Sequence, residues 1–247
     1  MPAKNIFPLT VRLAGAKLRS SRFTVAVLAA LPAFLVYLGV RDSQETAMKF
    51  FLFFFPYVFL LFAQDMVASE IAGGGLENVL FLGGRFRNFL WQKNLALAAA
   101  AGAYAAGLFL LLSVWGVARG TPGPFPAAQF GMGVLAGLYY IGLAGLLSWF
   151  LKAGSNVVVI LLAQAAWLVG LLFSATSRTG FIDHLGTGVF PGLNSRLLFM
   201  GFTSVFPNLV VSRRLFHGGL VVVAGLALAL ILQRALAWRL ELCKQGR

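Results

Sequence analysis

Six long apolar runs constrain this chain more than any other feature of its sequence. The hydrocarbon core of a bilayer is about 30 Å thick, so a helix rising 1.5 Å per residue needs roughly 20 apolar residues to cross it. Runs near that length cover residues 23–40, 48–63, 95–117, 130–151, 157–174 and 218–232. The sequence therefore predicts an all-α polytopic membrane protein with six transmembrane helices, forming one domain over residues 1–247.

The charged residues fit the same interpretation. Only 11% of the residues are charged and 60% are hydrophobic. A water-soluble fold could not bury that much apolar surface. The net charge of +13 comes from Lys and Arg that lie mainly between and beside the apolar runs, where anionic lipid headgroups would meet them. No basic face with interleaved aromatics remains outside the spans, so we expect membrane lipid as a partner and no nucleic acid.

The distribution of basic residues predicts the topology. With the N-terminus inside, the cytoplasmic segments carry 13 Lys and Arg and the outer segments carry 7. Because cytoplasmic loops are enriched in these residues, both termini are predicted to lie in the cytoplasm.

Two segments outside the spans are predicted to have structure of their own. In residues 1–22, apolar residues from Phe7 to Leu18 recur on one helical face, which predicts a basic interfacial helix on the inner leaflet. The alternative is a disordered basic tail. Residues 175–217 are too long for an ordinary loop, and their apolar part contains Gly201 and Pro207, so we expect a re-entrant or interfacial helix pair outside rather than a seventh span.

Polar residues inside the spans are candidates for a substrate path, since they are costly in a bilayer. The candidates are Tyr139, Asn156 and Gln164. Each could instead hydrogen-bond a neighbouring helix. Four glycines give the fourth span a small-residue face for close packing, within or between subunits: Gly133, Gly137, Gly142 and Gly145.

The segment 65–93 is predicted to be a structured cytoplasmic loop. A glycine triplet at 73–75 interrupts the helix, and residues 76–82 can form a short new helix. That helix is apolar on the side of Leu76 and Leu80 and acidic at Glu77, so it could dock into a cleft of a cytoplasmic partner. The alternative is a loop that only spaces two helices.

This loop resembles the ABC-2 family of ATP-binding cassette transporter permeases. The loop after the second span in that family typically reads Glu, three residues, Gly-Thr-Leu-Glu, one residue, Leu-Leu, then Ser-Pro and a basic stretch ending in Lys. The matching positions here are Glu70, Gly74, Leu76, Glu77, Leu80, Arg85 and Lys93. The departures are Gly75 for Thr, Val79 for the first Leu, and Gly83-Gly84 for Ser-Pro. The predicted architecture is similar to the family over nearly the whole chain.

The resemblance implies a transport subunit, an exporter in a bacterial inner (plasma) membrane, that works as a dimer with separate ATPase subunits. ATP and Mg²⁺ would then lie on the partner and no cofactor on this chain, which contains no Gly, four residues, Gly-Lys-Ser/Thr loop. The ATPase-coupling residues would be Glu70, Leu76, Glu77, Leu80 and Arg85. The alternative is a transporter or channel subunit driven by ion gradients, although the spans lack the buried carboxylates that such coupling usually employs.

An enzyme is the third possibility and the least favoured. The chain has two histidines, His184 and His217, and no cluster of metal-ligating or nucleophilic residues accompanies them. We therefore expect no catalytic or metal site.

Overall fold

The computed structural model describes residues 22–64, 74, 85–120, 126–151, 154–176 and 180–245. All regular structure in these residues is helical, which confirms the predicted fold class. The elements are α2 (Arg22–Arg41), α3 (Gln44–Phe54), α4 (Pro56–Phe62), α7 (Phe86–Ala118), α8 (Ala127–Leu147), α9 (Ser155–Thr176), α10 (Phe181–Thr187), α11 (Gly192–Val205), the 3-10 helices η1 (Pro207–Val211) and η2 (Arg213–Gly218), and α12 (Gly219–Gln245). The predicted interfacial helix at 1–22 lies outside the described residues apart from Arg22, where α2 begins.

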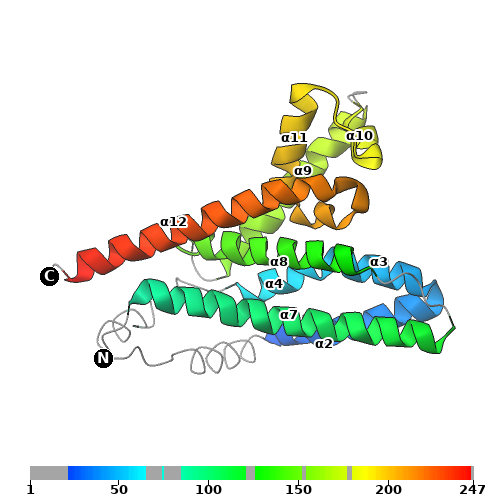
Figure 1. Cartoon of the computed structure of the whole chain (residues 1–247), viewed down its shortest axis with the longest axis horizontal. Helices are drawn as coiled ribbons and strands as arrows, with labels where there is room; N and C mark the ends of the chain where they lie inside the picture. The colour runs from blue at the N-terminus through cyan, green and yellow to red at the C-terminus, as the bar shows by residue number, and fades with distance from the viewer. Residues whose placement is uncertain are drawn as a thin grey trace.

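The helices form a bundle, and several of them are each long and apolar enough to span a membrane. Among the described residues, α2, α7, α8, α9 and α12 each meet that condition, and α3 with α4 forms a sixth, bent span. Successive spans run in opposite directions, and the start of α2, the start of α7 and the end of α12 lie toward the same end (Figure 1). The protein is therefore a polytopic helical membrane protein with the span order that the sequence predicts.

The second span is broken where its sequence contains proline. Ser43 caps the start of α3, since its hydroxyl accepts a hydrogen bond from the backbone N–H of Thr46 at 3.1 Å. Pro56 has no N–H to continue the helix and stands as the first residue of α4. The two helices are bent by 41°. The sequence predicted one continuous span over 48–63, and the structure corrects this to two short helices that begin four residues earlier.

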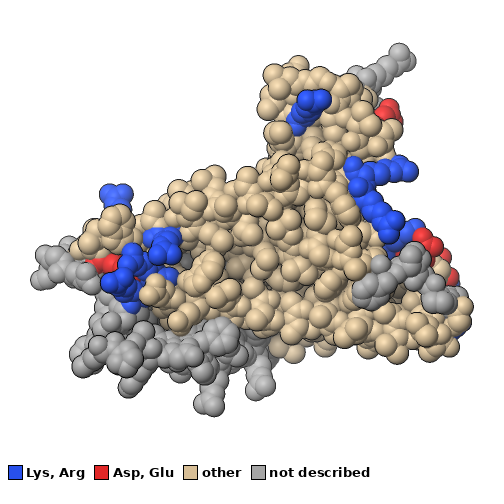
Figure 2. All heavy atoms as spheres, in the orientation of Figure 1, with Lys and Arg blue, Asp and Glu red and all other residues tan. Residues whose placement is uncertain are grey.

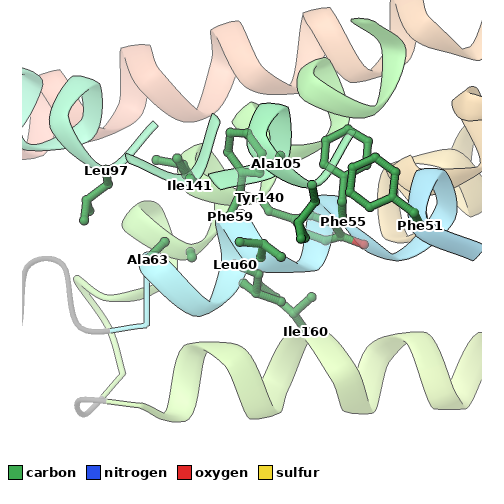
Figure 3. Close-up of a cluster of buried hydrophobic side chains, with 14 of the residues drawn as sticks. Phe51, Phe55, Phe59, Leu60, Ala63, Leu97, Ala105, Tyr140, Ile141 and Ile160 are labelled. Carbon is green, nitrogen blue, oxygen red and sulfur yellow. The ribbon is translucent and has the colours of Figure 1, made fainter. Parts of the chain in front are cut away.

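A row of phenylalanines from this broken span forms the centre of the core. Phe51, Phe55 and Phe59 recur every fourth residue and are fully buried. In Figure 3 they point toward α7 and α8, while Leu60 on the opposite side of α4 points toward Ile160 of α9. The second span thus lies in the interior of the bundle, enclosed by neighbouring helices.

The glycine face of α8 makes this close approach possible. A Cβ added at Gly133 would lie 2.4 Å from the Phe55 ring, and one at Gly137 would lie 2.5 Å from the Phe59 ring. Both distances are far below van der Waals contact, so the rings occupy the space that a side chain would need. The predicted small-residue packing is confirmed, and these contacts lie within one subunit.

The segment before the last span folds as a small lobe. Its helices α10, α11 and η2 surround a separate aromatic cluster that includes Phe181, Phe190, Phe199 and Phe202. Helix α11 has 14 residues, about 21 Å, which is shorter than the hydrocarbon core. The expectation of helices here, instead of a seventh span, is therefore confirmed. Figure 1 shows the lobe at the far end of α9, projecting from the bundle.

Two tryptophans mark the depth of the bundle in the membrane. Trp91 and Trp115 lie 24 residues apart on α7, about 36 Å at 1.5 Å per residue. Tryptophan gathers at both membrane–water interfaces, and this spacing brackets a hydrocarbon core of about 30 Å. Lys and Arg collect toward the two ends of the bundle and on the lobe, with a broad uncharged surface between them (Figure 2).

Candidate functional site

The predicted coupling residues fall mostly outside the described part of the chain. Glu70, Leu76, Glu77 and Leu80 are not described, so their roles stay predictions. Gly74 has φ +73°, a left-handed conformation that favours glycine, in agreement with a helix interrupted there.

The end of the predicted loop belongs to a helix. Arg85 stands in extended conformation at the N-cap of α7 with an exposed side chain. Because α7 begins at Phe86, residues 86–93 form its first turns, and Lys93 is buried there. The basic stretch is therefore a helical extension of the third span.

Gln164 is the centre of a buried polar network in the middle of α9. Its carbonyl oxygen accepts a hydrogen bond from the Tyr57 hydroxyl at 2.9 Å. Its amide nitrogen donates to the Tyr140 hydroxyl at 2.7 Å and to the backbone carbonyl of Val205 at 2.8 Å. Both donor positions of the amide are therefore used, and the side chain joins α4, α8 and α11.

Asn208 continues this network into η1. Its side-chain oxygen accepts from the Tyr140 hydroxyl at 2.7 Å, and its amide nitrogen donates to the carbonyl of Phe53 at 2.6 Å. Phe53 lies in the last turn of α3, just before the break of the second span. Asn208 is fully buried. Its amide supplies a hydrogen bond to a backbone carbonyl beside the break of the second span, where water is not available as a donor.

The backbone carbonyl groups at the end of α11 are hydrogen-bonded in the same place. Helix α11 ends at Val205, and the last carbonyls of a helix have no partner within it. Tyr139 donates to the carbonyl of Ser204 at 2.8 Å, next to the carbonyl that Gln164 holds. We call Tyr57, Tyr139, Tyr140, Gln164 and Asn208 the polar hub. It lies where the ends of two discontinuous helices meet.

The three predicted path residues are therefore engaged in helix contacts. Tyr139 and Gln164 belong to the hub, and Asn156 lies apart from it, donating to the carbonyls of Ala63 and Ala144 at 3.2 Å each. All three are buried. The structure brings two of them together around closed, hydrogen-bonded contacts, and a role in a substrate path stays a prediction.

Sequence reasoning missed a second polar contact between α7, α8 and α12. Asn94 donates to the side-chain oxygen of Gln233 at 3.2 Å, and Gln233 donates to the carbonyl of Gly142 at 2.6 Å. Gly145 leaves room for this glutamine, since an added Cβ would lie 2.7 Å from its amide nitrogen. A single glutamine after a long apolar run was the available signal.

A groove of about 320 Å³ opens beside this contact, between α7 and α12. Its lining includes the polar and charged residues Arg87, Asn94, Gln233 and Arg234, together with Trp91 and apolar residues of both helices. Glu241 accepts a hydrogen bond from the backbone N–H of Arg87 at 2.8 Å and holds the start of α7 against α12. Within the described ranges, no three His, Cys, Asp or Glu residues lie close enough to hold a metal ion.

In comparisons with known protein families, curated proteins and solved structures, no match to this chain was found.

Proposed function

We propose that this chain is the membrane-spanning permease subunit of an ATP-binding cassette transporter, an exporter whose energy comes from ATP hydrolysed on a separate subunit. The observation that carries the proposal is the polar hub, where two discontinuous helices meet in the interior of the bundle. In secondary transporters, substrate sites typically lie near the bilayer midplane at broken helices, so the hub supports a transport function, whereas other residues indicate the energy source. The hub joins the broken second span to α8, α9 and η1, so relative movement of these helices would alter its hydrogen bonds.

The choice between an ATP-driven and an ion-driven transporter rests on two further observations. Among the described residues, the one buried carboxylate is Glu241, which lies near the end of α12 and holds the start of α7. Proton or sodium coupling usually employs carboxylates at membrane depth, and the described spans offer none. The loop from Glu70 to Lys93 resembles the ABC-2 coupling loop, which favours an ATPase partner.

The proposed mechanism uses the loop as a lever. A cytoplasmic ATPase dimer closes on ATP and pushes the helix predicted at 76–82, with Leu76 and Leu80 as apolar anchors. Glu70 holds the base of that lever, and Glu77 and Arg85 make polar contacts. The push passes to the broken second span, which ends just before the loop. Two such chains form the complex, since two-fold pairing is the commonest closed assembly.

The test is association with an ATPase in native membranes. An affinity-tagged chain should copurify an ATP-hydrolysing partner, and Leu76→Ala with Leu80→Ala should reduce that partner at least tenfold at matched expression, because truncating interface anchors commonly costs about 2 kcal/mol. Asn78→Ala is the control, since residue 78 falls on the opposite face of a helix over 76–82. Wild-type chain that captures no ATPase, or a double mutant that keeps it, would refute the proposal.

A further inference from the structure

We propose that the groove between α7 and α12 binds an anionic phospholipid from the leaflet at the start of α7. The phosphate would lie between Arg87 and Arg234, and an acyl chain would follow the apolar side of α12 past Leu230 and Ala227. This binding site does not depend on the proposed transport function.

The groove changes from charged to apolar along its length. The contacts of Arg87 with Glu241 and of Asn94 with Gln233 fix α7 and α12 as antiparallel neighbours. From Arg87 to the level of Leu230 is therefore about ten residues, or about 15 Å. Arg87 and Arg234 line the groove over about six residues from the start of α7, and Leu230, Ile231 and Ala227 line the part beyond them. A charged head joined to a hydrocarbon tail matches this order, whereas a soluble anion would use one end only.

Two polar atoms of groove-lining residues have no hydrogen-bond partner among the described residues. They are Nε of Arg87 and Oδ1 of Asn94, and both are buried. Asn94 is only 8% exposed. Buried polar atoms are nearly always hydrogen-bonded, since an unmet one costs about 1–3 kcal/mol. The guanidinium of Arg87, whose side chain is half-buried, is a donor from which a lipid phosphate can accept.

The position of the groove in the membrane agrees with a lipid ligand. Trp91 lines it and is half exposed, at the depth of the membrane–water interface marked above. Ile231 lines the same groove and is 64% exposed, so the apolar part opens sideways toward the bilayer. Glu241 lies nearby, but its carboxylate is held by the backbone N–H of Arg87 and does not line the groove. Within the described part of the chain, neither guanidinium group forms a salt bridge with a carboxylate.

The experiment counts lipids bound to the purified full-length chain by native mass spectrometry during titration with phosphatidylglycerol or phosphatidylcholine. Arg234→Gln and Arg239→Gln form a matched pair, since both arginines are exposed on α12 and only Arg234 lines the groove. Ala227→Trp and Ala224→Trp form a second pair, both exposed on α12, of which only Ala227 lines the apolar end.

We expect phosphatidylglycerol to bind at least about fivefold more tightly than phosphatidylcholine, and Arg234→Gln to remove that preference while Arg239→Gln keeps it. Ala227→Trp should weaken both lipids, and Ala224→Trp neither. Equal effects within a pair would overturn the proposal. Displacement of the lipid by millimolar glycerol 3-phosphate would show a site for soluble anions instead. An Ile231→Cys chain on a Cys243→Ser background that crosslinks to a second copy, with or without phosphatidylglycerol, would assign the groove to the dimer.

Discussion

Replacing Asn208 by leucine should destabilise the protein by about 1.2–2 kcal/mol. The two side chains have similar size, so the main change is the loss of the hydrogen bonds to Tyr140 and to the Phe53 carbonyl. A buried hydrogen bond contributes about 1 kcal/mol, and cycles within a membrane bundle average about 0.6 kcal/mol. Two lost bonds therefore give about 1.2–2 kcal/mol.

The measurement is reversible unfolding in mixed detergent micelles, followed by far-UV circular dichroism. Asn88→Leu is the control. Asn88 is exposed on α7, so this substitution makes the same chemical change at the surface. Tyr140→Phe, alone and combined with Asn208→Leu, gives the coupling energy of the shared bond, expected at about 0.5–1 kcal/mol. A loss for Asn208→Leu below about 0.5 kcal/mol, the scatter of surface substitutions, would refute the role of Asn208 as a backbone partner.

Three further results are expected. Gly137→Ala should lower the melting temperature in detergent, at a cost of about 1–3 kcal/mol, because the added Cβ would lie 2.5 Å from the buried Phe59 ring. Gly131→Ala, which has open space around it, should change the melting temperature little. Equal melting temperatures for the two variants would contradict the packing. In intact cells a membrane-impermeant maleimide should label a cysteine placed at the exposed Asp183, whereas native Cys243 should react only after the membrane is opened; the reverse pattern would invert the topology. Mass measurement in lipid nanodiscs should find two copies of this chain per active complex, and an active complex with one copy would exclude the dimer.

The spans were predictable because a helix segment in the hydrocarbon core must be apolar. The ends of the helices were not predictable in this way, because a helix can continue beyond the hydrocarbon core. The third span was predicted from residue 95, yet α7 begins at Phe86, since Phe86 and Phe89 pack into the core below the apolar run. The last span was predicted to end at residue 232, yet α12 continues to Gln245 through the buried Gln233 and Glu241.

The polar hub could be predicted only in part. Gln164 stood out as an amide in an apolar run, so its importance was readable. Its partner Tyr57 lies 107 residues away, and the Phe53 carbonyl that Asn208 binds lies 155 residues away. Contacts at such separations depend on how the helices pack, and no local pattern specifies them. Asn208 itself was not singled out, because it lies in a short 3-10 helix within a segment expected to be external.

The distance in sequence between Phe53 and Asn208 also has a consequence for biosynthesis. The second span is translated 155 residues before Asn208, so until then the Phe53 carbonyl lacks this donor, and lipid hydrocarbon cannot supply one. Completion of the bundle interior is therefore a late step, reached only after the fifth span and the lobe have been made. A nascent chain halted before residue 208 would hold inserted helices whose broken second span lacks the hydrogen bond from Asn208.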